Sequence, residues 1–228
     1  MPALTAHQLL EHPVFAALSL EEASALLERQ RPLNAPAEQV LLLSQDEGEG
    51  PLIILEGLAK VRAFSADGEE VVMAVLGPGD LFGEMSVLLG GVRSADVIAL
   101  TALEVVRLMA APFREQLHRD ARLPLALARL QAERLSTLNR RFLQRGGDAA
   151  SRVLSVLLDL ALRWSRGRDA GVQIPPLPQR ELAAMAGLSR ETTSRTVTQL
   201  RQRGVLSVDE HGTRLLNLEA LRRRGLLD

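Results

Sequence analysis

The sequence predicts an α+β fold in which a β-rich N-terminal part, a long helix and a small helical C-terminal domain follow one another. Short apolar runs separated by glycines fill residues 40–108. Apolar residues at helical spacing dominate residues 111–164, and a helix-turn-helix spacing occupies residues 180–200. Strands and helices are therefore segregated along the chain, which is typical of this fold class.

The N-terminal part begins with helix and continues as strands. Residues 7–31 carry apolar side chains at helical spacing, and Ser19 followed by Glu21 and Glu22 marks a helix start. Strand-length runs then alternate with glycines that can adopt positive φ, which indicates compact antiparallel β-structure. The predicted strands are residues 40–43, 52–55, 58–64, 70–76 and 95–100.

The middle of the chain predicts two helices. Residues 111–118 can form a short helix, and Pro124 can occupy the first turn of a longer one that runs to about Gln144. Gly146 and Gly147 then end the helix and provide a hinge. One side of the long helix is apolar and can pack on the β-structure. This side comprises Leu127, Leu130, Leu135, Leu138 and Phe142.

The C-terminal part predicts a helix-turn-helix followed by a β-hairpin wing. Asp148 can cap a helix that supplies core residues, Gly187 makes the turn of the helix-turn-helix, and Ser189 caps its second helix. Residues 204–208 and 214–217 flank a tight turn and predict the hairpin. The apolar core of the helix-turn-helix comprises Leu182, Ala183, Ala186, Leu188, Val197 and Leu200.

Charge is distributed unevenly along the 228 residues. Residues 1–112 hold 16 acidic and 6 basic side chains, whereas residues 113–228 hold 12 acidic and 21 basic ones, so that the net charges are −10 and +9. A basic half that coincides with a helix-turn-helix pattern favours double-stranded DNA as a partner. Arginines that merely solvate helix faces remain the alternative.

Composition excludes several classes of function. The chain has no cysteine, which excludes disulfides, thiolate zinc sites, cysteine-held iron–sulfur clusters and cysteine nucleophiles. Its four histidines lie far apart, without a metal-ligand or nucleophile–base motif. We therefore expect neither a catalytic nor a metal site, and binding in place of an enzymatic reaction. Without a signal-peptide pattern or a bilayer-length apolar run, we expect a cytoplasmic protein with no membrane partner.

Residues 83–95 assemble the groups that hold a cyclic phosphodiester. Gly83 permits close backbone approach, and the Glu84 carboxylate can accept a hydrogen bond from a ribose hydroxyl. Arg93 and Ser94 can supply charged donors, a hydroxyl and backbone N–H groups to a phosphate. The run therefore predicts a pocket for a cyclic nucleotide. The alternative is an internal ion pair between Glu84 and Arg93 with no ligand.

Two motifs resemble those of one family. Gly83-Glu84 followed after eight residues by Arg93-Ser94-Ala95 resembles the phosphate-binding cassette of cyclic-nucleotide-binding domains. Residues 187–195, GLSRETTSR, resemble the DNA-reading helix of the same proteins. By these motifs the chain resembles the cyclic AMP receptor protein/FNR family of bacterial transcription regulators.

The resemblance implies a complete architecture. It implies a jelly-roll-like antiparallel β-roll that binds cyclic nucleotide in residues 1–118, a dimerisation helix in residues 119–145 and a winged helix-turn-helix DNA-binding domain in residues 146–228. Cyclic AMP would be the allosteric ligand of a homodimer, with RNA polymerase as a further partner. Two alternatives stay open, namely a DNA regulator with another ligand or none, and a nucleotide-binding regulatory subunit of a partner enzyme.

In this family a Thr-Ser pair on the long helix recognises the base, and that position corresponds here to Thr137-Leu138. Thr137 retains a hydroxyl for the exocyclic amine of adenine. Leu138 departs from the family pattern, because its side chain can neither donate nor accept a hydrogen bond. The departure puts strict selectivity for cyclic AMP in doubt.

The second helix of the helix-turn-helix carries the predicted DNA contacts. Arg190, Glu191 and Arg195 match the base-reading residues of the family, and the resemblance implies TGTGA-like half-sites in a twofold-symmetric operator. Arg can bond guanine O6 and N7, and Glu can accept from cytosine N4. A solvated Arg–Glu–Arg helix face is the alternative. The predicted phosphate contacts are Gln179, Ser189 and Thr192.

Overall fold

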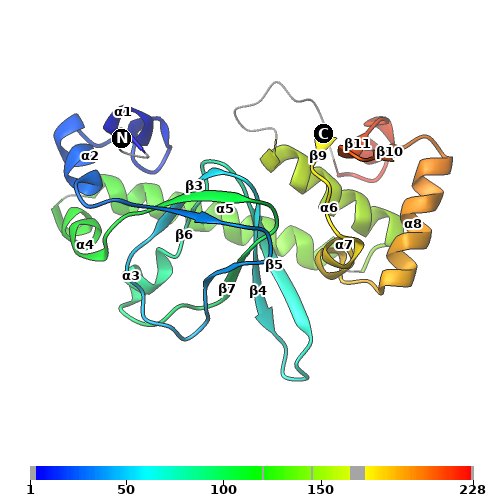
Figure 1. Ribbon diagram of the computed structural model, residues 1–228, viewed down its shortest axis with the longest axis horizontal. Helices are drawn as coiled ribbons and strands as arrows, with labels where there is room; N and C mark the ends of the chain where they lie inside the picture. The colour runs from blue at the N-terminus through cyan, green and yellow to red at the C-terminus, as the bar shows by residue number, and fades with distance from the viewer. Residues whose placement is uncertain (1–3, 120, 145, 165–172, 227–228) are drawn as a thin grey trace.

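The computed structural model describes residues 4–119, 121–144, 146–164 and 173–226. Figure 1 shows a β-rich N-terminal part and a helical C-terminal part, with a long helix running along the strands toward the C-terminal part. The order of elements confirms the α+β class that the segregated sequence patterns predict.

Two short helices open the chain, α1 (Ala6–Glu11) and α2 (Leu20–Leu27). Each begins with a capping box, and in α2 the box joins Ser19 to Glu22, as the sequence predicts. The predicted helical segment is split after His12. Pro13 explains the break, because proline disfavours helical backbone in the residue before it.

The β-roll consists of two antiparallel four-stranded sheets, with strand orders β1-β8-β3-β6 and β2-β7-β4-β5. The five predicted strands form to within one residue at each end, as β2, β3, β4, β5 and β7. The core between the sheets includes Leu52, Ile54, Phe82, Val97 and Val105, all buried. The strands are β1 (Arg31–Ala35), β2 (Val40–Leu42), β3 (Leu52–Glu56), β4 (Ala59–Phe64), β5 (Glu70–Leu76), β6 (Leu81–Phe82), β7 (Asp96–Ala99) and β8 (Leu103–Arg107).

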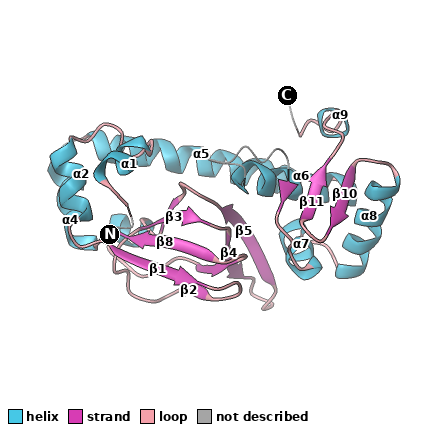
Figure 2. Cartoon of the chain, turned by 45° about the horizontal axis from the view of Figure 1, so that its top comes forward, coloured by secondary structure: helices cyan, strands magenta, loops and turns pink. Residues whose placement is uncertain are grey.

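One short helix lies within the β-roll, and two further helices connect the roll to the C-terminal domain. Helix α3 (Met85–Leu89) lies between β6 and β7 in the chain, and α4 (Ala110–Arg119) follows β8. Helix α5 (Arg122–Gln144) begins and ends close to the predicted bounds, and Figure 2 shows that it passes over the strands. Leu123 and Leu127 near its start are buried, whereas Leu135 and Phe142 further along are 58% and 71% exposed.

The C-terminal domain is a helix-turn-helix with a wing (Figure 2). Helix α6 (Ala149–Trp164) is capped by Asp148, and α7 (Gln179–Ala186) and α8 (Arg190–Gln202) meet at Gly187, whose φ is +59°. The predicted hairpin forms as β10 (Leu206–Asp209) and β11 (Gly212–Leu215). A strand that the sequence did not indicate, β9 (Gln173–Ile174), pairs with β11, and α9 (Glu219–Arg222) follows the wing.

The β-roll and the C-terminal domain share one apolar core. Three buried residues of the roll, Leu58, Val75 and Leu100, belong to the same cluster as buried residues of α6, α7 and α8. The contribution of these helices includes Val153, Leu154, Leu157, Ala186, Val197 and Leu200. The two parts are therefore packed against one another by the hydrophobic effect as well as joined by the chain.

Candidate functional site

The phosphate-binding run forms a turn, a short helix and a return. Gly83 follows β6 with φ of +74°, a left-handed conformation that favours glycine. A Cβ atom at this position would lie 2.6 Å from Nη1 of Arg93. Helix α3 ends at Gly90 with φ of +68° and returns the chain toward Arg93. The left-handed backbone thus favours glycine at position 83, and a side chain there would also displace the guanidinium of Arg93.

Arg93 is a buried cation with neutral partners. Its side chain donates to the carbonyl oxygens of Gly83 and Gly50, the latter at 2.8 Å, and to Oγ of Ser86 at 3.0 Å. The residue is only 4% exposed, and in the described part of the chain no carboxylate lies within ion-pair distance of it. Burial lowers the pKa of Arg93, and the charge of Glu84 opposes that shift. A buried charge without a counterion is costly, so the site fits an anion.

Glu84 is a buried carboxylate that is only half satisfied. Its Oε1 accepts from Nε2 of Gln131 at 2.6 Å and from Nη1 of Arg134 at 2.8 Å, both on α5. Its Oε2 is buried and has no hydrogen-bond partner, although the residue is 1% exposed. An orphaned acceptor of this kind fits a hydroxyl donor such as that of a ribose. The carboxylate pairs with Arg134, so the alternative of an internal pair with Arg93 is not what the structure shows.

The contacts from α5 to the pocket were not indicated by the sequence. Gln131 and Arg134 are three residues apart and therefore share one side of the helix, from which both reach Glu84. Arg134 also donates to the carbonyl oxygen of Leu81. The feature that the sequence offered was a pair of long polar side chains, Gln131 and Arg134, among the apolar residues of α5. Ser86, which bonds Arg93, likewise lacked any distinguishing pattern.

The other two predicted ligand residues lie at the margin of this site. Ser94 is exposed, and its hydroxyl lies 3.8 Å from Sδ of Met85. Thr137 donates its hydroxyl to the carbonyl oxygen of Glu133, at 3.0 Å, one turn earlier on α5. Leu138 lines a separate pocket of about 480 Å³ under the β4–β5 hairpin. The structure thus brings together Gly83, Glu84 and Arg93, and it places Thr137 one turn beyond Arg134.

Helix α8 presents its predicted base-reading residues to solvent. Its start is capped by Ser189, whose Oγ accepts from the backbone nitrogen of Thr192 at 3.1 Å. Arg195 and Glu191 form an exposed ion pair at 2.6 Å, with side chains 64% and 82% exposed. Arg190 is exposed as well, whereas the opposite side of α8 is buried in the core. Because Glu191 is paired with a cation, its charge is partly compensated before any DNA arrives.

The turn of the helix-turn-helix is held by a residue outside it. Arg152 of α6 donates to the carbonyl oxygen of Ala186 at 2.9 Å and to that of Gly187. A Cβ atom at position 187 would lie 2.7 Å from Nη2 of Arg152. The predicted phosphate contacts lie at the starts of the two helices, with Gln179 at the start of α7 and Ser189 and Thr192 at the start of α8, where their hydroxyl oxygens are 2.9 Å apart.

The part of the chain that the structure describes holds neither a metal-binding cluster nor a membrane-spanning helix. Within the described residues, no three His, Asp or Glu side chains are grouped so that they could hold a metal ion. No helix in the described ranges is long and apolar enough to cross a membrane.

Comparison with known families assigns both halves of the chain. Residues 32–120 match the cyclic nucleotide-binding domain. Residues 151–224 match the Crp-like helix-turn-helix domain. The first match contains Glu84 and Arg93, and the second contains the whole of α8.

Individual relatives agree with these matches. The cyclic AMP receptor protein of Thermus thermophilus is 35% identical over 199 residues, which cover 85% of this chain and 88% of that protein. A CRP-like cAMP-activated global transcriptional regulator of Mycobacterium tuberculosis is 25% identical over 92% of this chain and 95% of its own. The structure of FixK2 from Bradyrhizobium japonicum shares the fold, with a TM-score of 0.74, 21% identity and coverage of 85% of this chain and 96% of that one.

Proposed function

The chain belongs to the CRP/FNR family of transcription regulators, and on that premise we propose that it is a homodimer whose binding to DNA is controlled by cyclic AMP. The family is not enzymatic, and its members bind DNA through the helix-turn-helix. Residues 1–118 would sense the nucleotide, residues 119–145 would pair the two copies, and residues 146–228 would bind the operator.

The observation that carries the ligand proposal is the buried Arg93 without an ionic partner in the described residues, together with the buried Oε2 of Glu84 that has no hydrogen-bond donor. The single negative charge of a cyclic phosphate suits the guanidinium of Arg93, which has only neutral partners in the described residues. The ribose 2′-hydroxyl would donate to the orphaned Oε2 of Glu84. Ser94 would add a hydroxyl and a backbone N–H, and Thr137 would meet the adenine amine.

The contacts of Glu84 supply a route from ligand to dimer helix. Gln131 and Arg134 tie the carboxylate to α5, so a ligand that bonds Glu84 acts on the element proposed to pair the two copies. A ligand shifts an equilibrium only when it binds the two states unequally. The exposed apolar residues Leu135 and Phe142 of α5 support pairing of this helix in a homodimer.

Pairing of two copies would place two reading helices on one face of a DNA duplex. Arg190, Glu191 and Arg195 would read TGTGA-like half-sites spaced about 34–36 Å apart, the distance between successive major grooves on the same face. The predicted phosphate contacts at Gln179, Ser189 and Thr192 would fix the register. A regulator of this type would act on transcription through RNA polymerase.

Leu138 favours one second candidate, a DNA regulator of the same fold that responds to another nucleotide or to none. Its side chain lines an apolar pocket with Phe64 and Phe142 and offers no hydrogen bond to a base. In contrast, the exposed reading side of α8 argues against a regulatory subunit of an enzyme.

Calorimetry and DNA binding test the proposal together. The wild-type chain is titrated with cyclic AMP, cyclic GMP and cyclic di-GMP, and its affinity for a palindromic TGTGA duplex is then measured with each nucleotide at fixed salt. We expect cyclic AMP to bind and to strengthen DNA binding. Binding of another nucleotide, or none, would favour the second candidate, and failure to bind any palindromic duplex would contradict a DNA regulator.

A further inference from the structure

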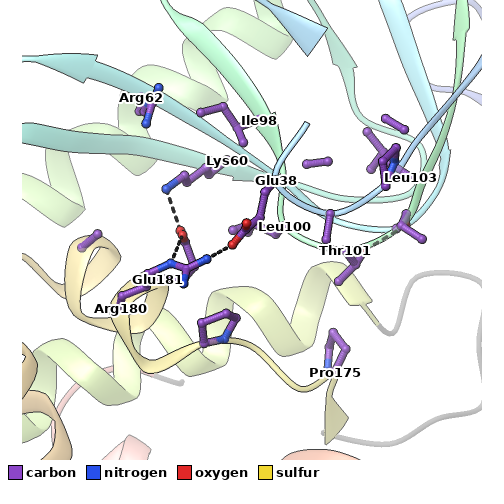
Figure 3. A pocket seen from close by; sticks show the side chains of 18 of the residues that line it. Glu38, Lys60, Arg62, Ile98, Leu100, Thr101, Leu103, Pro175, Arg180 and Glu181 are labelled. Atoms are coloured by element: carbon purple, nitrogen blue, oxygen red, sulfur yellow. Dashed lines mark hydrogen bonds and ion pairs between the residues drawn. The ribbon is translucent and has the colours of Figure 1, made fainter. Parts of the chain in front are cut away.

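The only lysine of the chain is buried between its two domains. Lys60 on β4 is 4% exposed, and its Nζ lies 2.6 Å from Oε1 of Glu70 on β5. The same nitrogen lies 2.6 Å from Oε2 of Glu181, in the first turn of α7. Figure 3 shows Lys60 reaching from the sheet to this helix. One buried cation therefore joins the β-roll to the first helix of the helix-turn-helix, and we call Lys60, Glu70 and Glu181 the interdomain triad.

Further contacts lie beside the triad and join the same parts of the molecule. Arg180 pairs with Glu38 of the roll (Figure 3), and Arg163 at the end of α6 pairs with Asp80. At Gly77 the two backbones approach so closely that a Cβ atom would lie 2.9 Å from Cβ of Arg163. The triad thus belongs to a specific docking surface, which also includes the shared apolar core.

The docked arrangement turns the start of the reading helix toward acidic residues. A cleft of about 1,770 Å³ separates the two parts, and Ser189 and Arg190 contribute to one wall. The roll lines the same cleft with Glu38, Glu56, Glu104 and two further glutamates against the cations Lys60 and Arg62, so its wall is acidic on balance. DNA phosphates approaching Arg190 would meet this acidic surface, and electrostatic repulsion would weaken binding.

We propose that the interdomain triad is a latch that holds the helix-turn-helix against the β-roll in an arrangement that binds DNA weakly, and that tight DNA binding requires the Lys60–Glu181 contact to open. This inference rests on the proposed reading of DNA by α8. It adds a contact that acts on α7 directly and is distinct from the link between the nucleotide pocket and α5.

The triad can be broken without stranding a charge. In Lys60→Met, Glu70 keeps Arg62 at 3.0 Å and Glu181 keeps Arg180 at 3.6 Å. In Glu181→Gln, Lys60 keeps Glu70. Both variants should therefore fold, which thermal melting checks. The matched control is Glu70→Gln, which removes the partner inside the roll and leaves the interdomain pair between Lys60 and Glu181.

The distance between two spin labels reports whether the latch is closed or open in the absence of nucleotide and DNA. Because the chain has no native cysteine, spin labels can be attached to Glu115→Cys on α4 and Glu210→Cys in the wing, both exposed positions. Labelled chain is diluted with unlabelled chain, so that each pair of labels lies within one protomer. We expect longer and broader distances in Lys60→Met and Glu181→Gln, and the wild-type distribution in Glu70→Gln.

DNA binding then tests what the latch controls. Without nucleotide, Lys60→Met and Glu181→Gln should bind the palindromic TGTGA duplex about tenfold more tightly than wild type, a change typical of allosteric coupling. Unchanged distances in both variants would overturn the latch. Longer distances with equal or weaker DNA binding would overturn its inhibitory role. A wild-type chain that never binds the duplex contradicts the proposed function instead, while the distances still judge whether the triad holds the domains together.

Discussion

Single residues place charged side chains in the buried interior of this molecule. Glu84 and Arg93 are buried within one short run of sequence, yet each turns to different partners. Glu84 faces α5 and Arg93 faces backbone carbonyls, which leaves one acceptor and one positive charge for a ligand.

Arg93→Ala should abolish the nucleotide response, because the phosphate loses its countercharge in a largely desolvated pocket. Truncating one partner of a buried charge pair typically costs about 2–5 kcal/mol. Calorimetry with cyclic AMP on folded variant protein measures the loss, and Arg93→Lys, which keeps the charge but not the fork, should fall between alanine and wild type. Wild-type affinity in the alanine variant would remove Arg93 from the site.

Thr137→Ala should weaken cyclic AMP more than cyclic GMP. The Thr137 hydroxyl already donates to Glu133, so its oxygen remains an acceptor suited to the adenine amine, whereas guanine presents a carbonyl at that position. The expected loss for cyclic AMP is about 0.5–1.5 kcal/mol. Thr137→Ser retains the hydroxyl and serves as the control. Equal weakening of both nucleotides would assign Thr137 to the helix surface and not to base choice.

At the scale of elements, helix ends follow local chemistry and strand partners do not. The capping residues Ser19, Asp148 and Ser189 were predictable because a cap depends on neighbours within three residues. In contrast, β1 begins with the unfavourable dipeptide Arg31-Pro32 and forms as an edge strand on β8. Its stability comes from a partner some 70 residues away, which no local pattern records.

The candidate nucleotide site was likewise predictable only where its residues lie close together in the sequence. Gly83, Glu84 and Arg93 lie within eleven residues, so their meeting could be inferred from one motif. The contacts of Gln131 and Arg134 with Glu84 span 47 and 50 residues. They depend on how α5 packs along the roll, which spacing within the helix does not determine.

Arg190→Ala and Gln179→Ala should separate base reading from phosphate contact. Arg190→Ala is expected to cost about 1–3 kcal/mol on a matched operator and much less on one already changed at the contacted G·C pair. Gln179→Ala should weaken all duplexes alike. Binding at one salt concentration on matched and altered duplexes gives both values. Equal loss on every sequence in Arg190→Ala would contradict direct readout by α8.

The capping carboxylate of α2 should make this element sensitive to acid. Bonds from the Ser19 backbone and from Gln116, together with Arg122, outweigh burial and hold the pKa of Glu22 below its ordinary value of 4.5. The stabilisation is therefore full above pH 4.5 and is lost as the pH falls through the lowered pKa. Glu22→Gln should lower the melting temperature at pH 7, and this difference from wild type should shrink as the pH falls below 4.5. A difference that stays constant as the pH is lowered would contradict this role.

At the scale of the whole molecule, two surfaces bear on the proposed function. One is the docking surface between the domains. The other is the apolar side of α5, on which Leu135 and Phe142 are exposed whereas Leu127 is buried. The docking surface lies within one copy of the chain, whereas the apolar side of α5 is suited to pairing with another copy.

Phe142→Glu and Leu135→Glu should each convert a dimer into monomers, because a charge would be buried in an apolar interface. Leu20→Glu is the control, since Leu20 is an exposed leucine on α2 and not part of the exposed apolar side of α5. Sedimentation at several concentrations measures the association. A wild-type chain that sediments as a monomer, or variants that remain dimeric, would remove α5 from the interface.

The core shared by Leu58, Val75 and Leu100 with α6 limits how this regulator can be recombined with its relatives. A chimera joined at Gly146 and Gly147, the predicted hinge between the domains, would pack the helices of a relative against these three side chains. A chimera that exchanges only the segment after α6 would meet the same constraint, because α7 and α8 supply Ala186, Val197 and Leu200 to that core. A new operator specificity is therefore expected to be easier to install at the exposed side chains of α8 than by exchange of a whole domain.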